Sequence, residues 1–322
     1  VEEIVQAVAR GPGRERHVHI VLENDANSAR LLDRGARAQW NDDAHHGFHV
    51  LLTGERDGYY ADYAADAPRL LARALAEGFS WQGEPSPHRG GEPRGEPSKH
   101  LPLTAFMPFL QNHDQVGNRA MGERLTALAP PERVRLATAM LLLAPSVPLV
   151  FMGEEFAART PFLYFCDFKG ELADAVREGR RREFASFARF ADERAREAIP
   201  DPNDPRTLAA SRLDWESLGQ PGHAAALEHF KRLVGLRFSM IVPRLAKGEA
   251  HGTYTSSAPG LVCVDWTLGD GSLLHLRANL SDGTDECAMP HGRLLHVEGT
   301  APSAGRIAPW SAGWWLLAGN AR

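Results

Sequence analysis

The sequence predicts an α/β fold in which parallel β/α units precede a small antiparallel β domain. In the first part of the chain, short apolar strands alternate with helices, as they do in proteins built from parallel β/α units. A polar cluster follows each of these strands, which is how a β/α barrel presents reactive side chains at the carboxyl ends of its strands. The predicted strands are 17–22, 36–40, 106–110 and 147–152.

Helices are predicted before and between these strands. Residues 1–10 form an amphipathic helix with Ile4, Val5 and Val8 on one face, and a Gly-Pro-Gly sequence ends it. A second helix follows strand 36–40 and extends through Leu52. Two more helices are expected at 66–78 and 133–143.

A Gly-, Pro- and Arg-rich stretch covers residues 83–102. Its composition allows two interpretations, a flexible linker or an ordered loop. We favour an ordered active-site loop, because a predicted strand follows directly and long loops inside compact domains are often functional.

The character of the chain changes near residues 242–252. A predicted helix at 223–237 is followed by short strands that Gly-, Asp- and Ser-containing turns separate, a pattern typical of an antiparallel sheet. We therefore predict a partial catalytic β/α barrel over residues 1–245 and an antiparallel β-sandwich over residues 246–322. The strands of the second domain are expected at 261–266, 272–280, 293–297 and 313–317.

Composition and charge exclude several classes of function. The 322 residues are 43% hydrophobic and 24% charged, and the formal net charge of −5 at pH 7 argues against nucleic acid or an anionic membrane as a partner. No apolar run reaches the length of a transmembrane helix, and the amino-terminal helix lacks the basic start of a signal peptide. The three cysteines are widely spaced and predict neither a metal site nor a disulfide framework, so the cytoplasm is the expected location.

The most informative segment, residues 112–119, follows the third predicted strand and reads Asn-His-Asp-Gln-Val-Gly-Asn-Arg. Capping of a strand-end turn explains one Asx residue at such a place, but not this whole run. We interpret the segment as part of a site at the carboxyl end of a barrel strand. Its candidate site residues are Asn112, His113, Asp114, Gln115 and Arg119.

A second polar cluster, residues 40–46, contains one Trp, two Asp and two His. Asp and His also bind metal ions, but adjacent His side chains on a helix point about 100° apart and seldom share one ion. A sugar site fits better, because a Trp ring offers an apolar face to a pyranose while Asp and His bond its hydroxyls. The candidate binding residues are Trp40, Asp42, Asp43, His45 and His46.

Residues 112–114 resemble the last catalytic motif of the alpha-amylase superfamily of glycoside hydrolases. The extended motif through Arg119 is similar to the form in maltooligosyltrehalose trehalohydrolases, which Glu23-Asn24-Asp25 and the 40–46 cluster also resemble. The resemblance implies that Asp114 hydrogen-bonds sugar hydroxyls and helps to distort the ring, while His113 binds a neighbouring hydroxyl. It also places Asp25 among the substrate-binding residues.

Glu23 is the candidate general acid/base. It follows the first predicted strand, where partial burial would raise its pKa and keep it protonated near neutral pH. A strand-end Glu is also typical of a solvated turn, so this interpretation depends on Asp114, which ends a strand two units later. The motif around Glu23 resembles the acid/base motif of the trehalohydrolases.

The number of β/α units leaves two architectures open. A closed barrel needs eight strands and about 250 residues, but only four units are predicted here. Either another architecture holds, or the sequence corresponds to the carboxyl-terminal half of a TIM (β/α)8 barrel with its small β domain; the resemblance favours the second. The superfamily's nucleophile, an Asp one unit before the acid, would then lie upstream of Val1, and the chain alone is expected to be inactive.

The resemblance implies a retaining hydrolase that cleaves the α-1,4-glucosidic bond next to the terminal trehalose unit of maltooligosyl trehalose. The implied partners are this substrate, related α-glucans and, within trehalose biosynthesis, a maltooligosyltrehalose synthase. No metal or organic cofactor is expected. Two alternatives stay open, an α-glucan branching or amylase-type enzyme and a non-catalytic glucan-binding remnant.

Overall fold

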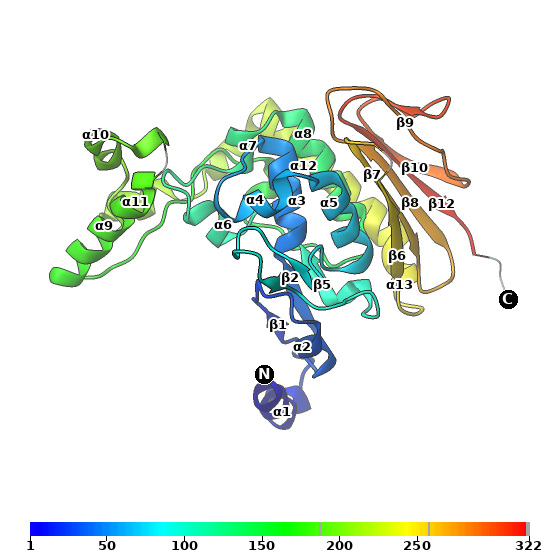
Figure 1. The fold of residues 1–322 in the computed structure, drawn as a ribbon, viewed down its shortest axis with the longest axis horizontal. Coiled ribbons are helices and arrows are strands. Elements are labelled where there is room, and N and C mark those ends of the chain that lie inside the picture. Colours follow the sequence, from blue (N-terminus) through cyan, green and yellow to red (C-terminus); the bar gives the residue numbers. More distant parts are fainter. Residues whose placement is uncertain (187, 257, 320–322) are drawn as a thin grey trace. The chain divides into compact units, whose positions relative to one another are not determined.

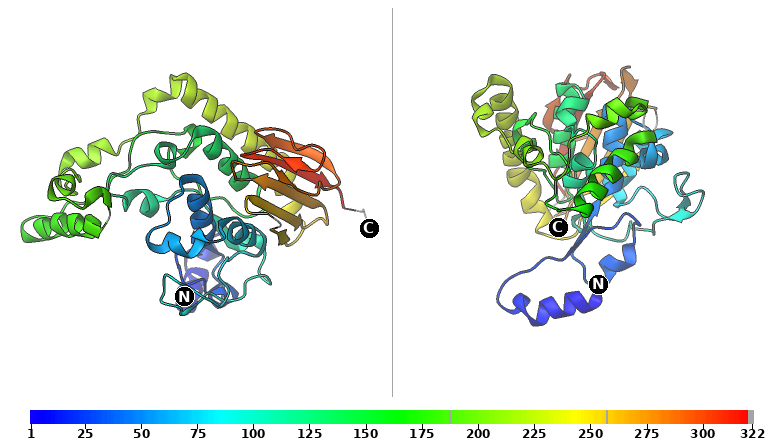
Figure 2. Two further views of the ribbon diagram at one scale, coloured as in Figure 1. Left: turned by 45° about the horizontal axis from the view of Figure 1, so that its top comes forward. Right: turned by 90° about the vertical axis from the view of Figure 1, so that its left-hand side faces the viewer.

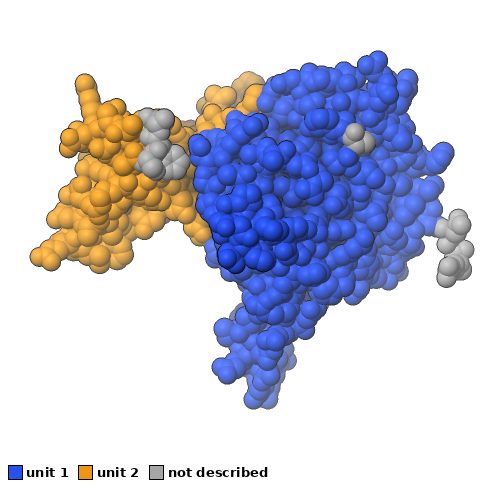
Figure 3. Space-filling view, in the orientation of Figure 1, with its two compact units in different colours: residues 1–110, 131–149, 231–322 blue, residues 111–130, 150–230 orange. Residues whose placement is uncertain are grey.

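The structure, a computed structural model, describes residues 1–186, 188–256 and 258–319 (Figures 1 and 2). It contains two compact units (Figure 3). The first comprises residues 1–110, 131–149 and 231–322, and the second comprises residues 111–130 and 150–230. The chain therefore leaves the first unit twice and returns to it twice. The predicted domain boundary between residues 245 and 246 stays a prediction.

The first unit contains a parallel sheet with the strand order β1-β2-β5. Its strands are β1 (Val21–Leu22), β2 (Ala38–Asn41) and β5 (Phe106–Pro108). β1 pairs with β2, and β2 with β5, in parallel register, so the carboxyl ends of all three strands meet at one edge. The parallel arrangement confirms the predicted one, although β1 is much shorter than expected.

The predicted fourth strand at 147–152 is wrong as a regular strand. The segment nevertheless runs along β5, since the Val147 amide donates to the Phe106 carbonyl at 3.3 Å and the Leu149 amide to the Pro108 carbonyl at 3.0 Å. The alternate amides thus continue the sheet without forming a complete ladder.

The predicted helices at 1–10, after strand 36–40, at 66–78 and at 133–143 are confirmed. α3 begins where the Asn41 side chain accepts the Ala44 amide at 3.2 Å, and it ends at Gly54, whose φ is 76°. The helices of this unit are α1 (Glu2–Arg10), α2 (Ala29–Asp33), α3 (Asp42–Thr53), α4 (Ala61–Ala64), α5 (Ala67–Glu77), α8 (Pro131–Leu143) and α13 (Val242–Leu245).

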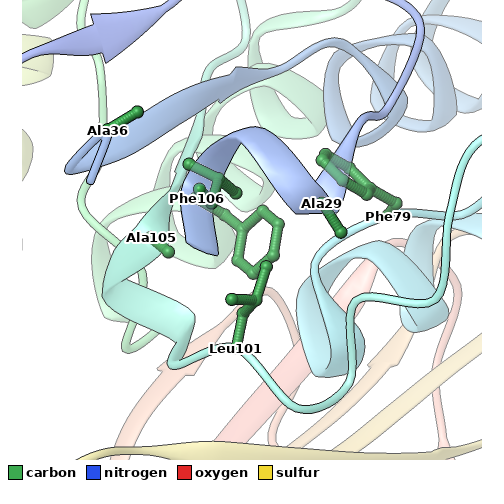
Figure 4. Packing of buried hydrophobic residues seen from close by; sticks show 7 residues of the cluster. Ala29, Ala36, Phe79, Leu101, Ala105 and Phe106 are labelled. Atoms are coloured by element: carbon green, nitrogen blue, oxygen red, sulfur yellow. The ribbon is translucent and has the colours of Figure 1, made fainter. Parts of the chain in front are cut away.

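The end of α5 packs tightly against the parallel sheet. Gly78 follows this helix with a φ of 95°, and its Cα faces the Phe106 ring of β5 so closely that a Cβ would lie 2.1 Å from Cζ. Phe106 is fully buried and meets Phe79 edge to face, with ring centroids 5.1 Å apart (Figure 4). A glycine is therefore required here for space as well as for backbone conformation.

Residues 83–102 form an ordered loop and not a flexible linker, whereas the active-site role of this loop stays a prediction. β3 (Glu84–Pro85) and β4 (Pro93–Arg94) form a short antiparallel hairpin. Its ends close where the Gly83 amide donates to the Arg94 carbonyl at 2.8 Å.

The antiparallel sheet has the strand order β10-β12-β8-β7-β6, and β9 and β11 form a separate two-stranded sheet. The four predicted strands are confirmed as β7, β8, β10 and β12. The other three were not predicted because they are short or carry few apolar residues. The strands are β6 (His251–Thr255), β7 (Leu261–Thr267), β8 (Leu273–Asn279), β9 (Asp285–Glu286), β10 (Arg293–Glu298), β11 (Arg306–Ile307) and β12 (Ser311–Leu317).

Both faces of this sheet are covered. On one face, the fully buried Trp266 of β7 donates its indole N–H to the Leu75 carbonyl of α5 at 2.9 Å. On the other face, Leu261 and Cys263 pack against Ile307 of β11 in a buried cluster. Burial on both sides explains why β7 reads as a nearly continuous apolar run.

A buried arginine lies against the carboxyl end of α8. Arg237 lies in a π-helical turn (Arg237–Ile241), and only 7% of it is exposed. Its guanidinium donates to the carbonyls of Leu142, Ala144 and Ser146 at 2.9, 2.5 and 2.6 Å. Leu142 lies in the last turn of α8, and the other two residues follow the helix. The cation therefore satisfies carbonyls at the carboxyl end of α8. Burial lowers the pKa of Arg237 to about 10.

The second unit is mainly helical, and the predicted helix at 223–237 is confirmed as α12. The core of this unit contains the buried side chains of Phe184, Phe190 and Ile199. No described helix of the chain is both long and apolar enough to cross a membrane. The helices of this unit are α6 (His113–Gly117), α7 (Leu125–Leu128), α9 (Glu171–Glu183), α10 (Glu193–Glu197), α11 (Pro205–Ala210) and the first part of α12 (Pro221–Leu236).

Substitution of Gly78 by Ala should destabilise the first unit strongly. The new Cβ would meet the buried Phe106 ring, so we expect a loss of roughly 3 kcal/mol in the free energy of unfolding. Gly54→Ala is the matched control, because Gly54 also has a positive φ but no atom lies within 4 Å of a Cβ there. It should cost about 1 kcal/mol. Equal losses in urea titrations would contradict the packing explanation.

Candidate functional site

Carboxyl groups gather at the carboxyl edge of the parallel sheet. Glu23 follows β1 directly, and Asp42 follows β2 as the first residue of α3. The strands are neighbours in parallel register, with Leu22 opposite Gln39, so both acids lie at the same edge. Burial raises the pKa of Asp42 to about 7, and the charges of Asp43, Asp25 and Glu23 add to this effect against the opposing charge of Arg94.

The predicted burial of Glu23 is wrong, because its side chain is exposed. β1 has only two residues, and Val21 is itself 39% exposed, so the strand offers Glu23 little apolar cover. At the same edge, burial raises the pKa of Asp42. The acid/base role of Glu23 stays a prediction.

Asp43 has a different environment from Asp42. It is fully buried, and its carboxylate accepts hydrogen bonds from five protein donors. Such a saturated group leaves no position for a sugar hydroxyl, so its contacts support a structural role in place of the predicted substrate contact. The donors are the Tyr63 hydroxyl, Arg94 Nη2 (3.0 Å), Asn27 Nδ2 (2.7 Å), and the amides of Ser80 (2.6 Å) and Trp81 (3.1 Å).

Arg94 is the counter-charge of this network. Only 4% of its side chain is exposed, and its guanidinium lies 3.0 Å from Asp43 and 3.7 Å from Asp62. It also donates to the Tyr63 hydroxyl at 2.9 Å and to the Asp25 carbonyl at 3.3 Å. The hairpin that carries Arg94 is thereby fastened to α3, to α4 and to the segment after β1.

Asp62 completes the network from α4. The Ser86 hydroxyl donates to its carboxylate at 2.5 Å, and the His88 amide at 2.7 Å. The structure shows that Arg94 neutralises the two buried carboxylates.

Asp25 stays at the surface. Its carboxylate pairs with Arg89 at 2.8 Å, with 74% of the Asp25 side chain and 33% of the Arg89 side chain exposed. An exposed pair of this kind holds its partners loosely. The carboxylate of Asp25 is therefore accessible to a ligand, whereas the carboxylate of Asp43 is not.

The two predicted histidines of α3 are buried and face different partners. His45 Nδ1 lies 2.8 Å from the Leu110 carbonyl, and its ring stacks on Phe109 at 5.2 Å. His46 packs against the rings of Tyr59 and Tyr63, at centroid distances of 4.8 and 5.0 Å. Burial lowers the pKa of His46 well below its usual value, which favours the neutral ring.

The metal interpretation of the 40–46 cluster gains no support from this geometry. Across the described ranges, no group of three or more His, Cys, Asp or Glu side chains is arranged to hold a metal ion. Trp40 is half-buried and meets Phe109 edge to face at 6.3 Å. Part of its ring therefore remains accessible at the sheet edge.

In the second unit, Asn112 caps α6. Its side-chain oxygen accepts the Gln115 amide at 2.8 Å, and only 4% of Asn112 is exposed. Asn112 is thus the one Asx residue that capping explains, and its contacts support a structural role.

The side chains that follow the cap are more open. His113 and Asp114 are 55% and 45% exposed, and His113 Nε2 lies 3.6 Å from Asp114 Oδ1. Gln115 and Arg119 are half-buried. Sequence reasoning did not identify the support of this segment, which is the buried Arg180 of α9. Its guanidinium donates to the carbonyls of residues 117 and 119 at 2.8 and 2.9 Å.

Two curated relatives of this chain carry the same enzyme name. Malto-oligosyltrehalose trehalohydrolase from Rhizobium sp. (strain M-11) is 39% identical over 242 residues, which cover 72% of this chain and 39% of that protein. The enzyme of the same name from Brevibacterium helvolum is 35% identical over 310 residues, covering 91% of this chain and 50% of that protein. The chain thus spans about half the length, or less, of these curated relatives.

A solved structure and a family model agree with these relatives. A Salmonella typhimurium protein, provisionally assigned as an alpha amylase, superimposes with a TM-score of 0.89 at 41% identity, covering 98% of this chain and 53% of that chain. A family model described as a domain of unknown function (DUF3459) matches residues 250–314, the region of the antiparallel sheet.

Removal of the buried cation should unfold the network. Arg94→Met leaves two buried carboxylates without a counter-charge, so we expect a loss of about 3–5 kcal/mol in the free energy of unfolding. Arg89→Met is the matched control on the same loop, and its exposed pair should contribute less than about 1 kcal/mol. Denaturant titrations measure both losses, and similar values would show that Arg94 is not the dominant counter-charge.

The stability of the chain should depend on Asp42 between pH 4 and pH 8. The folded carboxyl has a pKa of about 7 against an ordinary value of 3.8, so the folded state holds a proton that the unfolded state releases. This contribution to stability falls as pH rises through that window. Asp42→Asn should therefore gain up to about 4 kcal/mol relative to the unmodified chain between pH 4 and pH 8.

Asp57→Asn serves as the control for this titration, because Asp57 is exposed. It controls for the loss of one carboxylate from the chain. A stability difference between Asp42→Asn and the unmodified chain that does not vary with pH would contradict the raised pKa of Asp42.

Proposed function

This chain is a homologue of the malto-oligosyltrehalose trehalohydrolases, glycoside hydrolases of the alpha-amylase family, and we propose that it carries the acid/base part of such an active site. The reaction is hydrolysis of the α-1,4 bond next to the terminal trehalose unit of maltooligosyl trehalose, with release of trehalose. Related α-glucans are the wider class of proposed substrates. Maltooligosyltrehalose synthase is the functional partner that supplies this substrate.

Glu23 is the proposed general acid/base. It protonates the glycosidic oxygen as the bond breaks and then removes a proton from the attacking water, as retention of configuration requires. The second carboxylate of a retaining pair, the nucleophile, is not assigned to any residue of this chain. We accordingly expect the 322-residue chain alone to show no turnover.

Asp114 and His113 are the proposed sugar-binding pair of the second unit. Both side chains are exposed enough to reach hydroxyl groups. A carboxylate accepts bonds from hydroxyls, and a neutral imidazole can donate or accept, so the pair suits a polyol. Gln115 and Arg119 belong to the same proposed binding segment. Trp40 is a separate proposed sugar contact at the sheet edge of the first unit.

The observation that most supports this function is the cluster of Glu23, Asp25 and Asp42 at the carboxyl edge of a parallel sheet. Burial, together with the charges of neighbouring carboxylates, raises the pKa of Asp42 at this edge to about 7. A proton available near neutral pH is what general acid catalysis needs.

We also propose that β1, β2, β5 and the extended segment 147–149 belong to the carboxyl-terminal half of a (β/α)8 barrel. The successive parallel strands lie side by side in chain order, as they do in such barrels. Glu23 directly follows β1 of this sheet, and Asp42 directly follows β2.

An amylase-type enzyme is the second candidate, favoured by the Salmonella typhimurium structural neighbour. Product analysis separates the two. The full-length gene product should release trehalose from maltooligosyl trehalose and act poorly on amylose. Efficient cleavage of amylose without trehalose release would favour the second candidate.

Glu23→Gln in the full-length gene product should lower kcat by about 10²–10⁴, because the amide cannot transfer the proton. Binding of substrate should change little. Glu15→Gln is the control, since Glu15 is also exposed but lies before β1. A Glu23→Gln variant with near-normal turnover would remove Glu23 from the mechanism.

A further inference from the structure

Two buried cysteines lie together in the antiparallel region of the first unit. Cys263 is in β7, and Cys287 follows β9 directly. Their sulfur atoms are 3.4 Å apart, although the residues are 24 positions apart in sequence. They are 2% and 8% exposed, and both are free thiols.

The surrounding structure holds the two thiols in place. Cys263 is fixed by the ladders on both sides of β7, where it pairs with Thr255 of β6 and with Arg277 of β8. The Cys287 amide donates to the Gly305 carbonyl at 2.8 Å. The approach of the sulfurs thus follows from the register of two sheets and not from two mobile side chains.

The two sulfurs differ in reactivity. The hydrogen bond from Cys263 lowers the pKa of Cys287 to about 7, and the charge of Arg277 adds to this effect while burial opposes it. The same hydrogen bond and burial raise the pKa of Cys263. Arg277 is anchored beside them, with Nη1 2.7 Å from Asp265 Oδ1 and Nε 3.3 Å from the Ala288 carbonyl. Cys287 is therefore the nucleophile and Cys263 the resolving thiol.

We propose that Cys263 and Cys287 form a reversible disulfide when the protein meets a small hydroperoxide, and that this bond fastens the β9 segment to β7. The shared sulfur contact, the burial and the fixed register carry this assignment. It is independent of the glycosidase reaction, because neither cysteine belongs to the proposed site.

The chemistry balances with hydrogen peroxide as the oxidant. The Cys287 thiolate attacks one peroxide oxygen, the O–O bond breaks, and the leaving hydroxide takes up a proton to form water. The resulting sulfenic acid is attacked by the Cys263 sulfur, the S–O bond breaks, and a second water leaves with the Cys263 proton. Two thiols lose two electrons in total, and one peroxide gains them.

The disulfide should stabilise the antiparallel region. It closes a loop that contains β8 and β9, which restricts the unfolded chain. Oxidation should therefore raise the melting temperature by roughly 5 °C, and reduction with dithiothreitol should reverse the change.

The test uses the whole chain, fully reduced and then treated with hydrogen peroxide. We expect two of its three thiols to disappear and a Cys263–Cys287 linked peptide, lighter by two hydrogens, to be found by mass spectrometry. Cys166→Ser is the matched control, because Cys166 lies in the second unit and its loss should leave the linked peptide and the melting shift unchanged. Cys287→Ser should abolish both.

Three results would overturn the inference. The first is oxidation that stops at sulfenic or sulfinic acid on Cys287 with Cys263 still free. The second is a linkage that involves Cys166. The third is a linked peptide without any change in melting temperature, which would reject the stabilising role. Oxidation of the unsubstituted chain supplies all three measurements, so the test does not depend on the folding of any variant.

Discussion

The buried ion pair between Asp43 and Arg94 is the constraint on which the proposed site depends. Buried pairs of this kind add little net stability, because desolvation of both charges offsets their attraction. Loss of either partner is costly, however, and so the pair fixes position. Asp43 lies in the first turn of α3, just after β2, and Arg94 ends the β3–β4 hairpin. Their contact places a loop of mixed Gly and Pro composition against the parallel sheet, where composition alone predicts no definite conformation.

The same pair determines the electrostatics of the sheet edge. The guanidinium of Arg94 is engaged by the two fully enclosed carboxylates of Asp43 and Asp62. Only part of its charge acts on Asp42, and the exposed Arg89 is drawn to Asp25. Burial raises the pKa of Asp42, and the negative charges of Asp43, Asp25 and Glu23 add to this effect. The structural carboxylates of Asp43 and Asp62 thus differ from the carboxylates of the proposed site in their access to the charge of Arg94, and not in residue type.

Local sequence signals predicted much of the fold but not this distinction. Apolar periodicity and end signals located α3, α5 and α8, because helix formation depends on nearby residues. Asp42 and Asp43 are neighbours in one motif, yet one faces the site and the other the interior. A rotation of about 100° per helical residue separates them, and only the packing of α3 decides which points inward. The Cys263–Cys287 contact was equally hidden, since it depends on β9, a two-residue strand with no apolar pattern.

The exposure of Glu23 and the raised pKa of Asp42 are compatible with one acid/base site. The charge of Glu23 adds to the raised pKa of Asp42, although burial is the largest cause of that shift. A sugar bound over the strand ends would exclude water from Glu23, and desolvation raises the pKa of a carboxyl. Substrate binding would then favour the proton on the residue nearest the glycosidic oxygen. In the proposed site, the ligand itself would therefore supply the enclosed position that Glu23 lacks in the free chain.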